Sequence, residues 1–233
     1  MLASFYQNFL EKYLNKAQLI TLKMLVWLLQ NQKQVRLERL AATLPLPIQQ
    51  NSRRRHLQRF LTLNALSVVL LWFPIIAEII NQHFKVGSQL IIAMDRTQWR
   101  ENNVLMVSVI YQKRGWPIYW CLLEKNGSSN FQEQQKVLRP VIRLLKNYKL
   151  VIIGDREFHS IELAHWLYKQ NIGFVFRQKK DTTFWEKGQN FQPLSSIDIY
   201  PGVRQFFTNV KFTQKRGFGR FNARSLLEKK VQG

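Results

Sequence analysis

Two stretches of the sequence, QLIIAMD (residues 89–95) and KLVIIGD (residues 149–155), decide the fold of this chain. Each is a nearly continuous apolar run that ends in an aspartate, which is typical of a buried strand. A first strand and the strand that follows a crossover helix commonly lie side by side and parallel, so that their carboxyl ends meet. The sequence therefore predicts that Asp95 and Asp155 lie close together at one edge of a mixed sheet.

The elements around these two strands are predicted from their periodicity and their turn signals. In chain order they are a hairpin of strands at residues 103–112 and 117–125, a helix at 131–147 interrupted by Pro140, a helix at 161–170 capped by Ser160, and a strand from Gly173. The predicted order is β-β-β-α-β-α-β. The fold class is therefore α/β, with a mixed sheet and flanking helices.

The charge of the chain limits the partners it can have. The 233 residues include 35 Lys and Arg but only 14 Asp and Glu, a formal net charge of +21, which indicates a polyanionic partner such as nucleic acid or an anionic membrane. The most apolar stretch, residues 65–80, contains Ser67, Pro74 and Glu78 and is shorter than the about 20 apolar residues of a membrane span. We therefore expect nucleic acid as the partner, and no membrane.

Cysteine usage and the N-terminus predict the compartment. The single Cys121 excludes a disulfide scaffold and a cysteine-based metal site, and fits a reducing environment. The first sixteen residues have neither a compact apolar region nor a small-residue cleavage site, so no secretory signal is expected. We expect a cytoplasmic, nucleoid-associated protein.

The first third of the chain is predicted to be helical. Helices are expected at residues 4–30 and 34–43, and LPLP (44–47) then breaks the second one. A third helix, SRRRHLQRFLTL (52–63), is expected to be capped by Asn51 or Ser52 and to bury an apolar face of Leu57, Phe60 and Leu61. This pattern is typical of a helix-turn-helix DNA-binding domain, although an ordinary bundle with a solvated basic face would show it too. The candidate DNA-binding residues on the third helix are Arg53, Arg54, Arg55 and Arg59.

The two strand-end aspartates suggest a metal site. Carboxylates are preferred ligands of Mg²⁺ and Mn²⁺, and two such ions about 3.5–4 Å apart can clamp the attacking and leaving oxygens of a phosphodiester. An aspartate after a strand is also a common helix cap, but the chain has only four Asp residues and none precedes Asp95. Arg96 and Arg156 could bind DNA phosphate or balance the carboxylates. Glu157 lies too near Asp155 in the chain to be a separate ligand, and we interpret it as a buried or salt-bridged acid.

Three blocks of sequence resemble the motifs of DDE-type insertion-sequence transposases, in their insertion-sequence-four-type branch. They are AMDRTQW (93–99), IIGDREFHS (152–160) and NIGFVFRQK (171–179). Residues 36–61 are similar to the DNA-binding region of that branch. The resemblance implies a ribonuclease-H-like core with two Mg²⁺ or Mn²⁺ ions, held by Asp95 and Asp155 as catalytic ligands, and adds Arg177 as a DNA-binding residue. It also implies metal-dependent cleavage of double-stranded DNA at element ends and strand transfer to target DNA, and leaves room for a homodimer in a DNA synapse.

The third acid of that family is not recognisable in this sequence. It is a Glu within a Tyr-x-x-Arg-x-x-x-Glu-x-x-x-x-x-x-Lys block, and neither Glu186 nor Glu228 has this context. We therefore expect a C-terminally truncated transposase of impaired activity, produced by a frameshift after Asn222. The alternatives are a non-catalytic DNA-binding protein or transposition inhibitor, and another ribonuclease-H-fold nuclease that uses Asp181 or Glu186.

The expected domains follow from these assignments. They are a helical DNA-binding domain at residues 1–65, a connecting helix or linker at 66–88, a ribonuclease-H-like core at 89–180, and the start of a β-rich insertion at 181–233.

Overall fold

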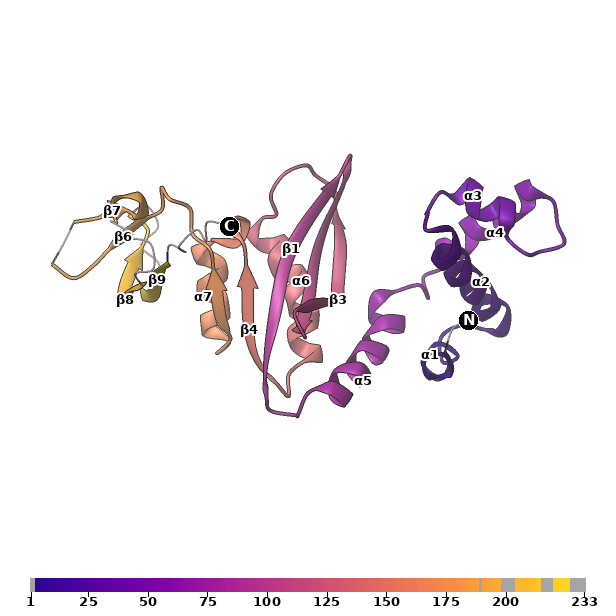
Figure 1. Ribbon diagram of the computed structural model, residues 1–233, viewed down its shortest axis with the longest axis horizontal. Helices are drawn as coiled ribbons and strands as arrows, with labels where there is room; N and C mark the ends of the chain where they lie inside the picture. Colours follow the sequence, from indigo (N-terminus) through magenta and orange to yellow (C-terminus); the bar gives the residue numbers. More distant parts are fainter. Residues whose placement is uncertain (1–2, 189, 198–203, 215–219, 227–233) are drawn as a thin grey trace, which may run out of the picture. The chain divides into compact units, whose positions relative to one another are not determined.

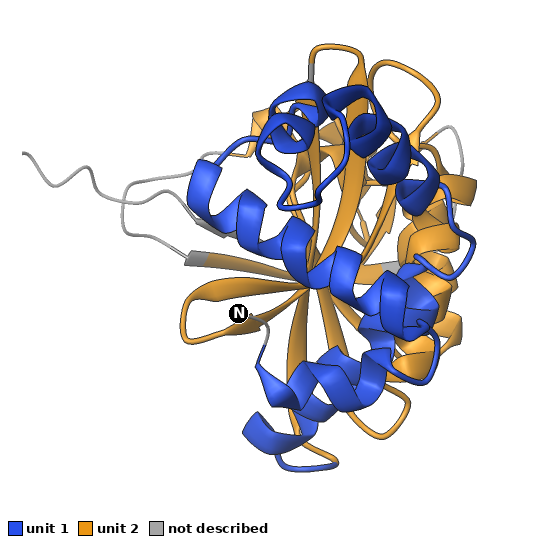
Figure 2. Ribbon diagram, turned by 90° about the vertical axis from the view of Figure 1, so that its right-hand side faces the viewer, with its two compact units in different colours: residues 1–86 blue, residues 87–233 orange. Residues whose placement is uncertain are grey.

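The computed structural model describes residues 3–188, 190–197, 204–214 and 220–226. The chain forms two compact units, residues 1–86 and residues 87–233, each described by itself below (Figure 2). Of residues 66–88, expected to connect two domains, residues 66–86 belong to the first unit and 87–88 to the second. Among the described residues, no helix is long and apolar enough to cross a membrane.

The first unit consists of helices. They are α1 (Ser4–Leu10), α2 (Lys16–Gln32), α3 (Leu37–Thr43), α4 (Gln50–Leu61), the π-helix η1 (Val68–Trp72) and α5 (Phe73–His83). The single helix predicted over residues 4–30 is divided in two, because Asn15 starts a new helix. Its side chain accepts from the Gln18 backbone N–H at 2.9 Å, while Gln18 Oε1 accepts from the Asn15 backbone N–H at 3.0 Å. This capping box satisfies the free N–H groups of the first turn of α2.

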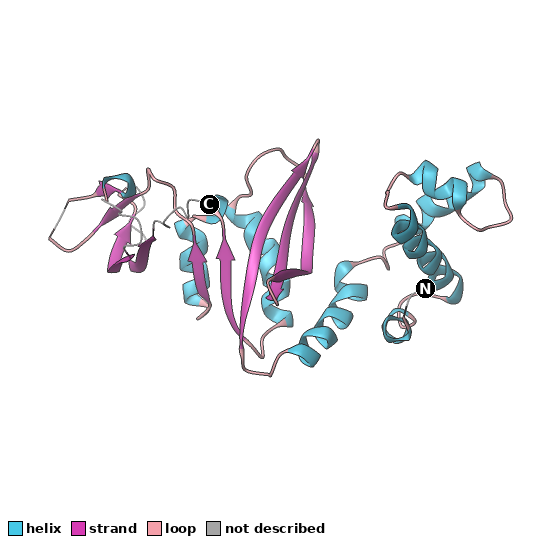
Figure 3. Ribbon diagram, viewed as in Figure 1, coloured by secondary structure: helices cyan, strands magenta, loops and turns pink. Residues whose placement is uncertain are grey.

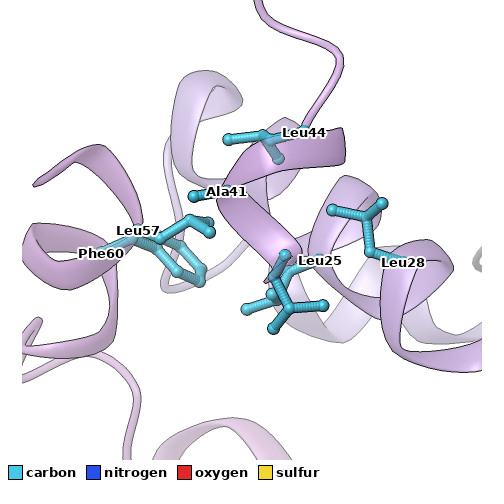
Figure 4. Close-up of a cluster of buried hydrophobic side chains, with 7 residues drawn as sticks. Leu25, Leu28, Ala41, Leu44, Leu57 and Phe60 are labelled. Carbon is cyan, nitrogen blue, oxygen red and sulfur yellow. The ribbon is translucent and has the colours of Figure 1, made fainter. Parts of the chain in front are cut away.

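The helices α2, α3 and α4 share one apolar core (Figure 4). Its buried side chains are Leu25, Leu28, Leu40, Ala41, Leu44, Leu57 and Phe60. The predicted burial of Leu57 and Phe60 is confirmed, whereas Leu61 is 51% exposed and does not belong to the buried face. On the same core, Thr21 Oγ1 lies 3.0 Å from His56 Nε2, which joins α2 to α4.

The helix α4 begins earlier than predicted. Its N-cap is Gln49, without a side-chain cap, so the prediction that Asn51 or Ser52 caps the helix is wrong. Arg53 explains the early start, because its guanidinium ties the first turn to the preceding segment. Its Nε donates to the Ile48 carbonyl at 2.8 Å and its Nη1 to the Ala42 carbonyl at 3.1 Å.

The second unit contains a five-stranded mixed sheet (Figures 1 and 3). Its elements are β1 (Gln89–Trp99), β2 (Asn102–Tyr111), β3 (Arg114–Leu123), α6 (Phe131–Leu144), β4 (Lys149–Gly154), η2 (Arg156–Phe158), α7 (Ile161–Lys169) and β5 (Gly173–Phe176). The strand order is β3-β2-β1-β4-β5. The pairs β1–β2 and β2–β3 are antiparallel, and the pairs β1–β4 and β4–β5 are parallel. The predicted element order and the parallel pairing of the two aspartate-bearing strands are confirmed. The prediction that the first strand ends at Asp95 is wrong, because β1 continues beside β2 as far as Trp99.

Two successive crossovers place α6 and α7 on the same face of this sheet, as their mutual contact shows. That face is apolar: Leu90, Ile92 and Met94 of β1 are buried at alternate positions. The helix α6 continues through Pro140, so the predicted interruption is wrong. An internal proline costs about 3 kcal/mol. Burial of an aliphatic side chain contributes about 1.5–3 kcal/mol, and α6 buries several of them, which outweighs the proline.

A smaller antiparallel sheet follows in the second unit. Its elements are β6 (Thr183–Trp185), β7 (Gln192–Pro193), the 3₁₀ turn η3 (Leu194–Ser196), β8 (Arg204–Phe212) and β9 (Arg220–Leu226), in the order β7-β6-β8-β9. Phe184, Val210 and Phe212 form its buried core, against which Ile161 at the start of α7 also packs.

Candidate active site at the strand ends

The register of the central strands brings the two aspartates together. The last paired residues of β1 and β4 are Met94 and Gly154, and Asp95 and Asp155 each come directly after them. Asp155 keeps an extended backbone, with φ −75° and ψ −167°. Side chains in matching positions of parallel strands point to the same face, so both carboxylates lie on the face opposite to the buried Met94. Both residues are exposed.

Each carboxylate is only partly used by the protein. Asp95 Oδ1 accepts from the Arg96 backbone N–H at 2.8 Å, and Asp155 Oδ1 accepts from the Glu157 backbone N–H at 2.9 Å. Asp155 is therefore also the N-cap of η2, as the alternative interpretation held. Within the described part of the chain, neither carboxylate forms an ion pair. The Oδ2 atoms of Asp95 and Asp155 accept no hydrogen bond there. Two such oxygens are suitable ligands for a hard divalent cation.

Behind the aspartates lies a largely buried ion pair. Arg96 Nε is 2.5 Å from Glu157 Oε2, and the two side chains are 19% and 10% exposed. The other oxygen, Glu157 Oε1, accepts from the Ser129 backbone N–H at 2.9 Å and from the Ser129 hydroxyl at 2.8 Å. Burial raises the pKa of Glu157, but these hydrogen bonds and the Arg96 guanidinium outweigh burial and hold the pKa below its usual value. The interpretation of Glu157 as a salt-bridged acid is confirmed.

Arg96 has a second internal partner. Its Nη1 donates to Asn103 Oδ1 at 3.1 Å, and the fully buried Asn103 donates through Nδ2 to the carbonyls of Lys125 and Gly127, both at 2.9 Å. Alternation along β1 turns Arg96 to the opposite face from Asp95. Arg96 therefore balances the charge of Glu157, and its predicted contact with DNA stays a prediction.

Exposed basic groups lie near the same edge. Arg156 and Lys179, with His159, line a cavity of about 490 Å³ between the segment that precedes α6 and the start of α7. Arg177 is also exposed, and its backbone N–H donates to the Gly154 carbonyl at 3.2 Å, which places it beside the end of β4. These side chains can meet a phosphate without breaking a salt bridge in the described residues.

The four arginines of α4 differ in their availability. Arg55 and Arg59 are exposed, whereas Arg54 pairs with Glu38 at 3.2 Å and Arg53 binds backbone carbonyls. The first two are therefore the better placed for a DNA backbone.

A third acid does not join the aspartates in the described part of the chain, where no group of three or more His, Cys, Asp and Glu side chains could hold a metal ion. Asp181 and Glu186 flank β6 in the smaller sheet. Glu228 lies outside the described residues.

The comparisons with known proteins identify a family. A family model described as "Transposase DDE domain" matches residues 87–231, which is more than half of the chain. The chain belongs to the DDE transposase family. The predicted DDE transposase family is thus confirmed, and the mixed sheet flanked by helices is compatible with a ribonuclease-H-like fold.

A solved structure also resembles the chain: the piggyBac transposase synaptic complex with hairpin DNA, at 13% identity and a TM-score of 0.40. The match covers 91% of this chain and 51% of the other, so the chain spans about half the length of that protein. No curated protein matches the sequence.

The DDE family generally uses divalent metal ions. The residues present fit such an ion in part, because Asp95 and Asp155 come directly after the last β1–β4 pair and each has an Oδ2 without a partner among the described residues.

Proposed function

We propose that this chain is a transposase of the insertion-sequence-four-type branch, which binds double-stranded DNA at element ends and catalyses metal-dependent cleavage and strand transfer to target DNA. The observation that carries the proposal is the β1–β4 register, which sets Asp95 and Asp155 directly after the last residue pair of the two strands. A synapse of two element ends would require two copies of the chain.

Each group has a distinct role in this proposal. Asp95 and Asp155 would hold Mg²⁺ or Mn²⁺, which activates water or a DNA 3′-hydroxyl as the nucleophile. The exposed Arg156 and Arg177 would bind phosphates of the DNA at this edge. Helices α3 and α4 would form a helix-turn-helix, with the exposed Arg59 among its contacts to the DNA backbone.

The two-carboxylate edge suggests that the chain binds DNA better than it cuts it. Two carboxylates hold a divalent cation less tightly than three. We therefore expect a site formed by Asp95 and Asp155 alone to cleave DNA slowly. The nucleotide sequence beyond the codon for Asn222, translated in all forward frames, tests the expected frameshift. A Tyr/Arg/Glu/Lys block there would provide the third acid, whereas an immediate stop would contradict the frameshift.

The direct test is Mn²⁺ binding by the purified chain and by its Asp95→Asn and Asp155→Asn variants. Both variants keep the size of the side chain and should lose Mn²⁺ binding, while their affinity for duplex DNA that flanks the gene should persist. Unchanged Mn²⁺ affinity in both variants would refute the proposed site.

The rival function is that of a DNA-binding inhibitor of transposition without catalysis. It is favoured by the lack of a three-acid cluster in the described residues. A transposition assay with Asp95→Asn separates the two functions. An inhibitor keeps its effect as long as DNA binding persists, whereas a catalytic chain loses its product.

A further inference from the structure

We propose that Arg96 and Glu157 are positioning residues, whose ion pair fixes the separation between the carboxylates of Asp95 and Asp155. The inference rests on the proposed role of these aspartates as metal ligands. Arg96 follows Asp95 directly, and Glu157 comes two residues after Asp155. The 2.5 Å contact between Arg96 Nε and Glu157 Oε2 thus links the two chain segments immediately beyond the aspartates.

A link is needed there because the backbone does not provide one. The parallel pairing of β1 and β4 ends at Met94 and Gly154, one residue before the aspartates. Beyond that point, β1 continues beside β2 only, while the chain after Gly154 turns into η2. In the described structure, the Arg96–Glu157 ion pair therefore joins β1 to the segment after β4 just beyond their last backbone pair, Met94 and Gly154.

Both members of the pair are held in place from behind. Glu157 Oε1 is fixed by the backbone N–H and hydroxyl of Ser129, and Gln134 Nε2 on α6 donates to that hydroxyl oxygen at 3.2 Å. Arg96 Nη1 is fixed by the fully buried Asn103. A largely buried network in which the partners are themselves hydrogen-bonded holds one geometry, which is what two metal ligands require.

The geometry does not favour direct roles for these two side chains. Both oxygens of Glu157 are occupied by Arg96 and Ser129, so the carboxylate has to leave its partners to ligate a metal. Arg96 points to the opposite face from Asp95 and is 19% exposed. A positioning role requires no change in the hydrogen bonds of either side chain.

The test compares Mn²⁺ dissociation constants, measured on the full chain by electron paramagnetic resonance, for Arg96→Gln, Glu157→Gln and the double variant. We expect each single variant to weaken Mn²⁺ binding by about 10–100-fold, the usual effect of losing an outer-sphere partner. The double variant should be no weaker than the worse single variant, because both changes break the same link.

The sign of the Arg96→Gln effect is decisive. If the side chains acted through charge alone, removal of the cation Arg96 would tighten Mn²⁺ binding and removal of the anion Glu157 would weaken it. The same holds if Glu157 is itself a ligand, because loss of Arg96 would free its carboxylate. A positioning role weakens binding in both variants. Tighter or unchanged binding in Arg96→Gln would overturn the proposal.

Control variants separate this effect from loss of the fold and from failure of the metal site. Lys125→Met breaks an ion pair of the same unit, 2.9 Å from Glu133, and should leave Mn²⁺ affinity unchanged. Should a Gln variant fail to fold, Ser129→Ala keeps both charges of the pair and should show a smaller loss; no loss there would also overturn the proposal. If Asp95→Asn does not lower Mn²⁺ affinity, the proposed function fails first.

Discussion

Replacement of Glu157 by Gln should destabilise the second unit by an amount that the hydrogen bonds of its carboxylate predict. Gln has a single carbonyl oxygen and no charge, so it cannot accept from both Arg96 and Ser129, and the ion pair is lost in either orientation; a hydrogen bond to a charged group contributes about 1.5–3 kcal/mol. Loss of one partner of a fully buried ion pair costs about 3–5 kcal/mol, and the residual exposure of Arg96 lowers that figure. We expect a loss of about 2–4 kcal/mol in the free energy of unfolding at pH 7.

The loss should depend on pH in a definite direction. The pKa of Glu157 is lowered in the folded chain, so its ionised form stabilises the fold above the unfolded pKa of about 4.3. That contribution disappears as the pH falls through the folded pKa. The difference in unfolding free energy between the wild type and Glu157→Gln should therefore be full at pH 7 and narrow progressively below about pH 4.3.

Urea denaturation followed by circular dichroism, in a series from neutral to acidic pH, measures this difference. The control is Lys125→Met, which removes a more exposed ion pair and should cost at most about 1 kcal/mol. A loss in Glu157→Gln no larger than that of the control, or one that does not change with pH, would refute the reasoning.

Other perturbations have equally specific outcomes. Gly154→Ala should cost about 1–3 kcal/mol and lower Tm, because its new Cβ would lie 2.8 Å from the ring of the buried Phe158. Leu57→Ala should cost about 2–5 kcal/mol in urea denaturation of the first unit, because Leu57 is fully buried. Arg59→Ala should weaken binding to any duplex DNA and lower the slope of log K against log salt by about 1.

Matched variants control these experiments. Leu61→Ala on the same helix removes a half-exposed side chain and should cost much less than Leu57→Ala; equal losses would contradict the assignment of the core. Lys85→Ala removes one exposed cation outside α4 and should leave the salt slope unchanged. An unchanged Tm in Gly154→Ala would mean that Phe158 can move away at little cost.

The element order and the parallel pairing of the two aspartate-bearing strands could be predicted from the sequence, because long apolar runs specify buried strands and a crossover helix usually returns the chain parallel to the first strand. Local rules failed where distant contacts outweighed them. Pro140 remains inside α6 because that helix buries apolar side chains along the sheet, and α4 starts early because Arg53 reaches backbone carbonyls before it.

The network behind the site could not be predicted in full. Asn103 and Ser129 read as ordinary turn or strand-end residues, and only the folded chain brings them to Arg96 and Glu157. The sequence after Asp155 predicted that Glu157 is buried or forms a salt bridge, but it did not predict which arginine would be the partner. Arg156 is the nearer neighbour in sequence, whereas the partner is 61 positions away.

Because Arg96 and Glu157 neutralise each other, they affect the order in which a divalent cation and a phosphodiester would bind at the aspartates. Their neutralisation leaves the two aspartates as an anionic spot, with no ion-paired cation in the described residues, on a chain whose formal charge is +21. The two carboxylates repel a phosphodiester and attract a divalent cation, while the exposed Arg156 and Arg177 nearby attract the phosphodiester. Under the proposed function, a bound cation would remove the repulsion between the aspartates and the scissile phosphate, so it should bind before that phosphate reaches them.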